Sequence, residues 1–292
     1  MACVLVTGCS SGIGLETALV LARAGHTVYA TLRNPDRASS LRQRAEKEKL
    51  PVSIAQLDVD SDESVAAAVA AFRSEAGFID VLVNNAGIER MGSIEELPWE
   101  AFRATMETNY FGALRCIRAC LPEMRKRRRG CIINVSSVAG RIACSPMSPY
   151  TASKFALEAV SEALAQEAKP FNIRVAIVEP GIIATPMAAR ISEAQVESAY
   201  PHVRRFSRMF EESLAHPTPP SLVAEIIRNI VESGTWQLRH TAGPDAEPFL
   251  GWRKSMTDEQ WVEWAALEDD AWHERVLADF GLDARPKTEQ KV

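Results

Sequence analysis

The sequence Thr7-Gly8-Cys9-Ser10-Ser11-Gly12-Ile13-Gly14 joins a short β-branched run, Cys3–Thr7, to a segment with helical periodicity, Gly12–Ala24. Glycines let the backbone turn tightly between a strand and a helix and approach a pyrophosphate closely. The start of the helix offers that anion unpaired N–H groups and the positive end of a dipole. A tight turn that binds nothing can carry the same glycines, so their spacing alone is a weak signal. No Gly-Lys-Ser/Thr follows, which disfavours a nucleotide-hydrolysing P-loop.

Predicted strands and helices alternate along the rest of the chain. This alternation indicates parallel βαβ units and a doubly wound, Rossmann-type α/β sheet, which binds ligands beyond the carboxyl ends of its strands. The later strands are predicted at Thr27–Thr31, Val52–Asp58, Asp80–Asn84, Cys131–Val135, Ile173–Val178 and Trp236–His240. The later helices are predicted up to about Lys49, over Ser61–Glu75 with Ser61 as N-cap, as one long helix from Pro98, and over Tyr150–Ala168.

The length of 292 residues and the apolar fraction of 47% fit one large α/β domain. We expect residues 1–246 to form a dinucleotide-binding catalytic domain, with residues 185–214 as a substrate lid. Such long connections are often lids. From about Glu247 the chain is rich in Trp and acid, and residues 247–292 are predicted to form a helical C-terminal tail.

Charge, cysteine content and hydropathy argue against several classes of protein. The net charge of −5 does not favour nucleic acid, and the basic run at residues 125–129 is interpreted as a solvated helix end. The six cysteines form no C-x-x-C pair and no His cluster accompanies them, so no metal site is expected. No secretory signal and no membrane-spanning stretch are visible, which predicts a cytoplasmic protein.

Tyr150 and Lys154 are four residues apart on a predicted helix and therefore share a face. A nearby ammonium favours the phenolate and lowers the pKa of a tyrosine, whereas burial raises it. A tyrosine whose pKa is brought toward the working pH exchanges a proton efficiently with an alcohol or ketone oxygen. By itself, however, such a pair is more often a surface contact.

Further motifs follow in an order that resembles the short-chain dehydrogenase/reductase family over about residues 3–246. The resemblance implies that Tyr150 moves a proton, that Ser137 orients the carbonyl, and that Lys154 tunes Tyr150 and binds ribose. It also implies that Asn109 holds a water beside the lysine. The resemblance further implies a homodimer or homotetramer whose subunits pair through the helices near Pro98–Met124 and Tyr150–Ala168. The motifs are Thr7-Gly8 to Gly14, Asn84-Asn85-Ala86-Gly87, Asn109, Asn134-Val135-Ser136-Ser137, Tyr150 with Lys154, and Pro180-Gly181 with Thr185.

The end of the second strand decides between the two nicotinamide dinucleotides. NAD-dependent relatives carry an acid there for the ribose hydroxyls, but this chain has Leu32 followed by Arg33, a cation suited to a 2′-phosphate. We therefore expect NADP(H), although Arg33 could instead be a solvated charge. The expected cofactor contacts are Gly8, Ser10, Ser11, Gly12, Ile13, Gly14, Arg33, Asp58, Val59, Asn85, Ala86, Gly87, Tyr150, Lys154, Pro180, Gly181, Ile183 and Thr185.

The stretch Tyr29–Arg33, together with the glycine-rich turn, most resembles the branch that holds estrogenic 17β-hydroxysteroid and photoreceptor retinol dehydrogenases. A bulky apolar alcohol or ketone is therefore expected: steroid-like, retinoid-like or aromatic. The loops 88–96 and 141–149 and the segment after Gly181 should surround it. Two other interpretations stay open: a regulator that senses NADP(H) without turnover, and an interaction protein whose tail recruits a partner. The predicted wall residues are Ile142, Met147, Met187, Phe206, Met209 and Phe210.

Overall fold

The computed structural model describes residues 1–194 and 197–286. Its centre is a sheet of seven strands in the order β3-β2-β1-β4-β5-β6-β7, and every neighbouring pair is parallel. This confirms the predicted doubly wound sheet. The strands are β1 Cys3–Thr7, β2 Thr27–Leu32, β3 Val52–Gln56, β4 Val81–Asn84, β5 Gly130–Val135, β6 Ile173–Pro180 and β7 Arg239–Ala242.

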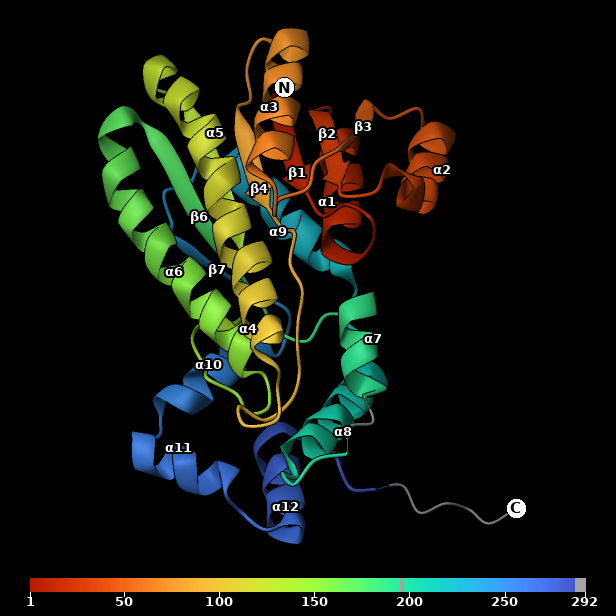
Figure 1. The fold of residues 1–292 in the computed structure, drawn as a ribbon, viewed down its shortest axis with the longest axis vertical. Helices are drawn as coiled ribbons and strands as arrows, with labels where there is room; N and C mark the ends of the chain where they lie inside the picture. The colour runs from red at the N-terminus through yellow and green to blue at the C-terminus, as the bar shows by residue number, and fades with distance from the viewer. Residues whose placement is uncertain (195–196, 287–292) are drawn as a thin grey trace.

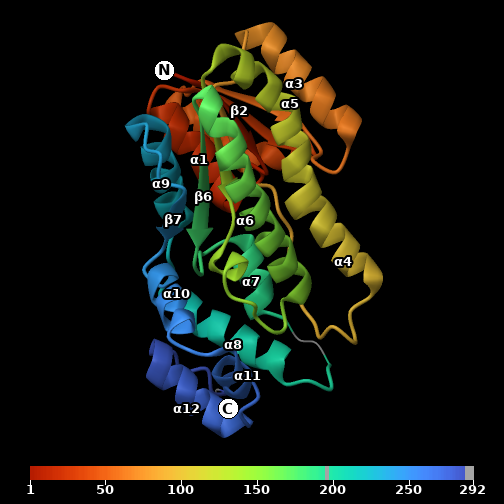
Figure 2. The same ribbon diagram turned by 90° about the vertical axis from the view of Figure 1, so that its left-hand side faces the viewer.

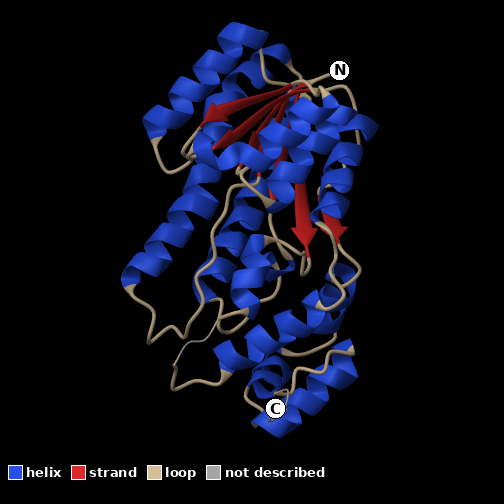
Figure 3. Ribbon diagram, turned by 90° about the vertical axis from the view of Figure 1, so that its right-hand side faces the viewer, coloured by secondary structure: helices blue, strands red, loops and turns tan. Residues whose placement is uncertain are grey.

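Helices cover both faces of the sheet (Figures 1 and 3). Alternate strand residues face opposite sides: Val4 and Val6 pack toward α1, α2 and α9, while Cys3 and Leu5 pack toward α3, α5 and α6. Burial on both faces explains why the strands read as continuous apolar runs. The helices are α1 Gly12–Arg23, α2 Ser39–Glu48, α3 Asp62–Ala76, α4 Trp99–Met106, α5 Gly112–Arg127, α6 Ser148–Ala168 and α9 Pro220–Ser233.

Two predicted elements are wrong in detail. The long helix expected from Pro98 is divided between α4 and α5 by a π-helical turn, Glu107–Phe111, which contains Asn109. The last strand lies at Arg239–Ala242 instead of Trp236–His240, because its partners are the final residues of β6, with Ile177 opposite Arg239. Trp236 stays outside the sheet, where the Lys169 ammonium lies 4.0 Å from its ring centroid.

The predicted lid and tail gather at the end of the molecule toward which β6 points (Figures 1 and 2). The lid segment contains α7 Pro186–Ser192 and α8 His202–Leu214. The tail is helical, as expected, with α10 Ala246–Lys254, α11 Asp258–Ala265 and α12 Asp269–Phe280. Across the described residues, no helix has both the length and the apolar character needed to cross a membrane.

Candidate active site

One cavity of about 580 Å³ runs from the glycine-rich turn, past the carboxyl ends of the strands, to the C-terminal helices. Open parallel sheets bind ligands at this edge. Of the predicted cofactor residues, all but Gly14 line the cavity. Three of the four predicted catalytic residues also line it, namely Ser137, Tyr150 and Lys154, whereas Asn109 does not.

The glycine-rich turn fits a closely approaching dinucleotide. Gly8 and Gly12 have left-handed φ values of +74° and +58°, which favour glycine. A Cβ on Gly8 would lie 2.8 Å from the Ala86 Cα. Ser11 caps α1 but makes no side-chain hydrogen bond to it, so the first-turn N–H groups stay available to an anion. A Cβ on Gly14 would overlap the Gly8 carbonyl oxygen, which explains why Gly14 packs behind the turn instead of facing the cavity.

The loop after β4 is fastened to this turn. The Asn85 Nδ2 donates to the carbonyl oxygens of Thr7 at 2.9 Å and Gly8 at 3.2 Å. The Thr7 hydroxyl oxygen accepts from the backbone N–H groups of Asn85 and Ala86. Asn85, Ala86 and Gly87 are therefore held at the cavity wall by the strand that carries the glycines.

Two cations line the cavity where β2 ends. Arg33 follows the buried Leu32, and its Nη1 lies 4.0 Å from the Asp60 Oδ2. Burial raises the pKa of Asp60. The second cation is Arg37, in the 3₁₀ turn Pro35–Ala38, and the sequence analysis missed it. Its spacing of four residues from Arg33, across a Pro-containing turn, was the available signal.

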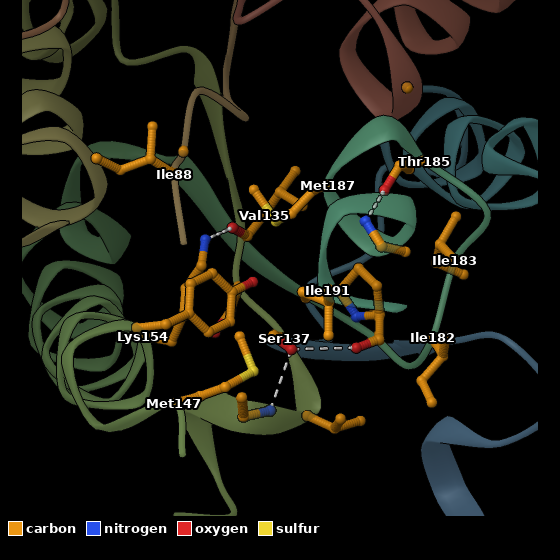
Figure 4. Close-up of a pocket in the computed structure, with 18 of the residues that line it drawn as sticks. Ile88, Val135, Ser137, Met147, Lys154, Ile182, Ile183, Thr185, Met187 and Ile191 are labelled. Atoms are coloured by element: carbon orange, nitrogen blue, oxygen red, sulfur yellow. Dashed lines mark hydrogen bonds between the residues drawn. The ribbon is translucent and has the colours of Figure 1, made fainter. Parts of the chain in front are cut away.

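Tyr150 and Lys154 lie one helical turn apart on α6, and the Lys154 Nζ is 5.5 Å from the Tyr150 ring centroid. Lys154 is 4% exposed and its Nζ donates to the Val135 carbonyl oxygen at 2.8 Å (Figure 4). Burial lowers the pKa of Lys154 to about 8, and the nearby Glu158 carboxylate opposes that change. The lysine is thus held in a fixed position at the inner end of the cavity.

Burial raises the pKa of Tyr150 to about 12, although the Ser137 hydroxyl acts in the opposite direction. Of the two opposing effects expected on this pKa, lowering by a nearby ammonium and raising by burial, burial is the larger. At neutral pH Tyr150 is a neutral phenol, which is the form that donates a proton.

Ser137 ends the loop after β5 and is fixed by two hydrogen bonds. Its Oγ accepts from the Ala139 N–H at 3.1 Å and donates to the Pro180 carbonyl oxygen at 3.4 Å (Figure 4). The second bond is long for a hydroxyl donor, so it can be exchanged for a bond to a ligand oxygen. This serine therefore lies between the β5 loop and the end of β6, facing the cavity.

Asn109 is buried behind the cavity. Its Oδ1 accepts from the Ile88 N–H at 2.8 Å, and its Nδ2 donates to the Ile88 carbonyl oxygen and the Ser153 hydroxyl, both at 2.9 Å. These bonds hold the Asn109 side chain against the β4–α4 loop and α6. That Asn109 positions a water beside Lys154 therefore stays a prediction. The π-helical turn around it supplies the necessary backbone geometry, and such turns are frequent at functional sites.

The far side of the cofactor region is formed by the segment after β6. Thr185 caps α7, where its Oγ1 accepts from the Ala188 N–H at 3.3 Å. Gly181 leaves no room for a side chain, because a Cβ there would overlap the Asp245 carboxylate. That carboxylate accepts from the Ile182 N–H at 2.7 Å. Asp245 was not predicted, although the glycine two residues before it marks a sharp turn.

All six predicted wall residues line the cavity, but the contribution of the β4–α4 loop is smaller than expected. Of the stretch 88–96, only Ile88 reaches the cavity. Its acidic residues instead hold the lid: Glu89 pairs with Arg190 at 3.2 Å. Glu95 accepts from the Tyr200 hydroxyl, and Glu96 accepts from the Ser198 hydroxyl at 2.7 Å. These three contacts are called the lid latch below.

The C-terminal tail contributes most of the cavity-lining residues that were not predicted from the sequence. Its aromatic side chains lie over the end of the cavity away from the glycine-rich turn. Because these rings line the cavity, the tail packs on its own domain, which argues against an arm that recruits a partner. The lining residues from the tail are Phe249, Trp252, Trp261, Trp264, Ala265, Trp272 and Phe280.

A parallel sheet with a glycine-rich turn, and with a half-buried tyrosine beside a buried lysine at its carboxyl edge, is typical of nicotinamide-dependent oxidoreductases. The chain belongs to the short-chain dehydrogenase family: the model described as short chain dehydrogenase matches residues 2–196. This confirms the resemblance seen in the sequence. Membership makes the protein an oxidoreductase of CH–OH groups that uses a nicotinamide cofactor.

Individual relatives differ in the substrates that their names give. The chain is 36% identical over 261 residues to retinol dehydrogenase 8 from Bos taurus, covering 85% of this chain and 83% of the relative. It is 36% identical over 266 residues to 3-ketodihydrosphingosine reductase from Bacteroides thetaiotaomicron, covering 90% and 95%. The crystal structure of a variant of actinorhodin polyketide ketoreductase with NADPH matches with a TM-score of 0.74 at 31% identity, covering 83% and 96%.

Proposed function

We propose that the protein interconverts a bulky, apolar secondary or primary alcohol with its ketone or aldehyde, using NADP(H). The observation that carries this proposal is the meeting of Ser137, Tyr150 and Lys154 in the cavity that the glycine-rich turn opens. The nicotinamide supplies or accepts the hydride when bound. In the reducing direction Ser137 holds the carbonyl oxygen, and the neutral Tyr150 phenol donates the proton to that oxygen. The Lys154 ammonium stabilises the phenolate that this leaves.

The preference for NADP(H) rests on Leu32, Arg33 and Arg37. A leucine cannot accept hydrogen bonds from ribose hydroxyls, and two guanidinium groups at the cavity wall suit a 2′-phosphate. Leu32→Asp should reduce the ratio of NADPH to NADH affinity by at least about tenfold, because like charges repel. Leu32→Asn is the uncharged control. Equal affinity of the parent for both dinucleotides would refute the assignment.

The apolar substrate is supported by Ile142, Met147 and the lid residues Met187, Phe206 and Met209, which line the substrate side. Methionine and phenylalanine form large, adaptable apolar walls. We expect kcat/KM with NADPH to rise along a series of ketones of growing apolar size, by about fourfold per buried methylene at most. A preference for small polar ketones or sugars would contradict this substrate class.

A non-catalytic NADP(H) sensor is the competing function. The presence of Tyr150, Lys154 and Ser137 in one cavity argues for turnover, because a sensor needs none of these groups to bind a dinucleotide. Oxidation of NADPH that depends on an added carbonyl compound separates the two. Binding of NADPH without such oxidation across the whole ketone series would favour the sensor.

We also propose that the enzyme assembles as a homodimer or homotetramer in the cytoplasm. In the segments 98–124 and 150–168, the side chains of Phe111 and Phe155 are 45% and 42% exposed. Subunit interfaces are enriched in aromatic side chains, so these two mark a candidate contact between subunits. The six cysteines are free thiols, which suits a reducing compartment.

A further inference from the structure

A basic and aromatic surface lies at the end of the molecule opposite the lid and tail. Helices α5 and α6 end there and β6 begins there (Figure 1). The basic run at residues 125–129, where α5 ends, supplies most of its positive charge. We call this surface the basic face; its cations are Arg125, Lys126, Arg127, Arg128, Arg129, Lys169 and Arg174, and its exposed aromatic residues are Phe78, Phe171 and Trp236.

Contacts between its segments make the basic face one continuous surface. The Asn172 Nδ2 donates to the Arg128 carbonyl oxygen at 3.0 Å, and the Arg128 Nη2 donates to the Pro170 carbonyl oxygen at 2.6 Å. These bonds join the end of α5 to the start of β6. A second cavity of about 580 Å³ opens beside them. Its lining includes Arg129, Asn172, Arg174 and Trp236.

The acidic residues that line this second cavity are paired with arginines. The buried Asp80 carboxylate lies 2.8 Å from the Arg127 Nη2 and 3.7 Å from the Arg129 Nε, so two cations share one anion. The Glu232 carboxylate lies 3.7 Å from the Arg228 Nε. The basic face therefore keeps an excess of positive charge, although the net charge of the whole chain is −5.

A solvated helix end, as expected from the sequence, explains only part of this charge. A helix C-terminus carries about half a negative charge, which does not require an unbroken basic run over residues 125–129. Arg125 and Lys126 are exposed and form no ion pair among residues 1–194 and 197–286. At the lid end, by contrast, the Arg205 Nε of α8 lies 2.7 Å from the Asp269 Oδ1 at the start of α12, and this ion pair joins the lid to the tail. Arg125 and Lys126 have no comparable structural role.

Three aromatic side chains are exposed among these cations. Phe78, Phe171 and Trp236 are 39%, 36% and 45% exposed. One face of each ring is covered by a cation, which leaves ring edges and positive charge side by side at the surface. Measured from the cation to the ring centroid, the pairs are Arg127 with Phe78 at 3.6 Å, Arg128 with Phe171 at 6.0 Å, and Lys169 with Trp236 at 4.0 Å.

Cations beside exposed aromatic rings match the headgroup layer of an anionic membrane. Lys and Arg side chains attract anionic headgroups, and Trp and Phe rings enter the boundary between headgroups and acyl chains. Single-stranded nucleic acid also attracts cations, but its bases stack on free ring faces. Because a cation already covers one face of each ring, a lipid surface fits this arrangement better. The second cavity has the volume of a small-ligand site and can receive a headgroup phosphate beside Arg129 and Arg174.

We propose that the basic face docks the protein on an anionic lipid bilayer. The rings of Phe78, Phe171 and Trp236 enter the headgroup layer, and the cations of residues 125–129 bind lipid phosphates. The cavity that holds Tyr150 lies at the opposite edge of the sheet, so docking leaves it clear of the bilayer. This inference goes beyond the proposed function and does not depend on it.

The test is co-sedimentation of the full chain with vesicles of phosphatidylcholine, either alone or with phosphatidylglycerol added. We expect binding only to the anionic vesicles, and loss of that binding in about 1 M salt, where the Debye length is about 3 Å. Each basic residue near an anionic surface strengthens binding about fivefold, so Arg125→Gln with Lys126→Gln should weaken it about 25-fold. Trp236→Ala should weaken it severalfold, because the ring no longer enters the headgroup layer.

Two matched controls keep the charge and aromatic changes but move them off the basic face. Arg42→Gln with Lys254→Gln removes the same charge from exposed positions on α2 and α10, and Trp99→Ala removes a more exposed tryptophan from α4. Both should bind anionic vesicles as the parent does.

Three results would overturn the docking proposal. They are equal binding of the parent to the two kinds of vesicle, equal losses in the control and basic-face variants, and tighter binding to a single-stranded RNA oligonucleotide than to anionic vesicles. Turnover of a water-soluble ketone with NADPH should be the same in all these variants, because the cavity with Tyr150 is remote from the basic face. Vesicle binding without any such turnover in the parent would count against the proposed function alone.

Discussion

Burial acts on the pKa values of Tyr150 and Lys154 in opposite directions. It raises that of the phenol to about 12 and lowers that of the ammonium to about 8, so each group is pushed toward its neutral form. The pair is therefore maintained at a cost to folding, as is common for residues kept for chemistry. These two pKa shifts affect both the turnover and the stability of the enzyme.

Tyr150→Phe removes the proton donor with little change in volume. We expect turnover of a good ketone substrate to fall by about 100- to 10,000-fold, the usual contribution of a general acid. NADPH affinity should stay within a few-fold of the parent value, as measured by fluorescence titration. A variant that retains most of its activity would show that another group donates the proton.

Lys154→Met tests the cost of the buried ammonium. The pKa of this lysine is 10.5 in the unfolded chain and about 8 in the folded protein, so between these values the unfolded state binds more protons. The parent therefore gains stability as pH rises through that window, by up to about 3 kcal/mol. The methionine variant lacks this gain. Its free energy of unfolding, relative to the parent, should fall between pH 8 and pH 10.5 in urea titrations.

Lys126→Met, at an exposed position on α5, is the control for that measurement and should show no comparable trend. A pH-independent difference between Lys154→Met and the parent would mean that Lys154 titrates normally in the folded protein.

At the scale of elements, the π-helical turn and the lid latch both depend on the loop after β4. Asn109 holds that loop from behind through Ile88, and the latch holds it to the lid from in front. The loop thus connects the π-helical turn that carries Asn109 with the predicted lid segment. Weakening either attachment should affect the site without touching Tyr150.

Asn109→Ala leaves the half-buried Ile88 N–H and carbonyl without their partners. An unpaired buried group costs about 1–3 kcal/mol and a half-buried group costs less, so the free energy of unfolding should fall by about 1–3 kcal/mol. Urea unfolding followed by circular dichroism measures this change. A loss below about 0.5 kcal/mol, the lower end of a net hydrogen bond, would indicate that the loop does not need Asn109. Asn134, whose Nδ2 donates to the buried Ser161 hydroxyl away from the cavity, offers a second buried asparagine for comparison.

Glu96→Ala removes the acceptor of three hydrogen bonds, from Ser93, Ser198 and the Ala199 N–H. Hydrogen exchange should become faster in residues 197–214, and KM should rise more than kcat falls. The bonds from Ser93, Ser198 and Ala199 lower the pKa of Glu96. The hydrogen bonds to Glu96 are therefore fully formed above the usual carboxyl pKa and weaken only as pH falls through the lowered pKa of Glu96. Glu100→Ala, an exposed acid on α4, is the control.

How much of the fold and of the site could be predicted depends on how far apart in sequence the interacting residues lie. The turn 7–14 and the pair Tyr150–Lys154 follow from local spacing, and the doubly wound parallel sheet follows from the alternation of strands and helices with right-handed crossovers. The π-helical turn depends on a side chain that bonds a backbone 21 residues earlier, which no periodicity records. The tail's place over the cavity depends on Arg205 and Asp269, 64 residues apart. Such contacts are set by tertiary packing, so the tail was predicted as helical but not as part of the site.

At the scale of the whole molecule, exposed apolar side chains mark the proposed subunit contact. Phe111→Glu with Phe155→Glu should convert the assembly to a monomer of 32.1 kDa at micromolar concentration, as measured by light scattering. Val262→Glu, at a more exposed apolar position on the tail, should leave the mass unchanged. A parent enzyme that is already monomeric would contradict the proposed assembly.

The tie between Arg205 and Asp269 has a consequence for evolution. The reacting groups lie within residues 2–196, the part that the family model matches, whereas much of the distal wall comes from α8 and the tail. Mutations in the wall can accumulate without disturbing proton or hydride transfer. Because lid and tail are joined by this ion pair, however, they must change together. A graft that moves residues 197–286 as one block between relatives should thus transfer substrate preference, whereas a graft of either part alone would break the pair and cost stability.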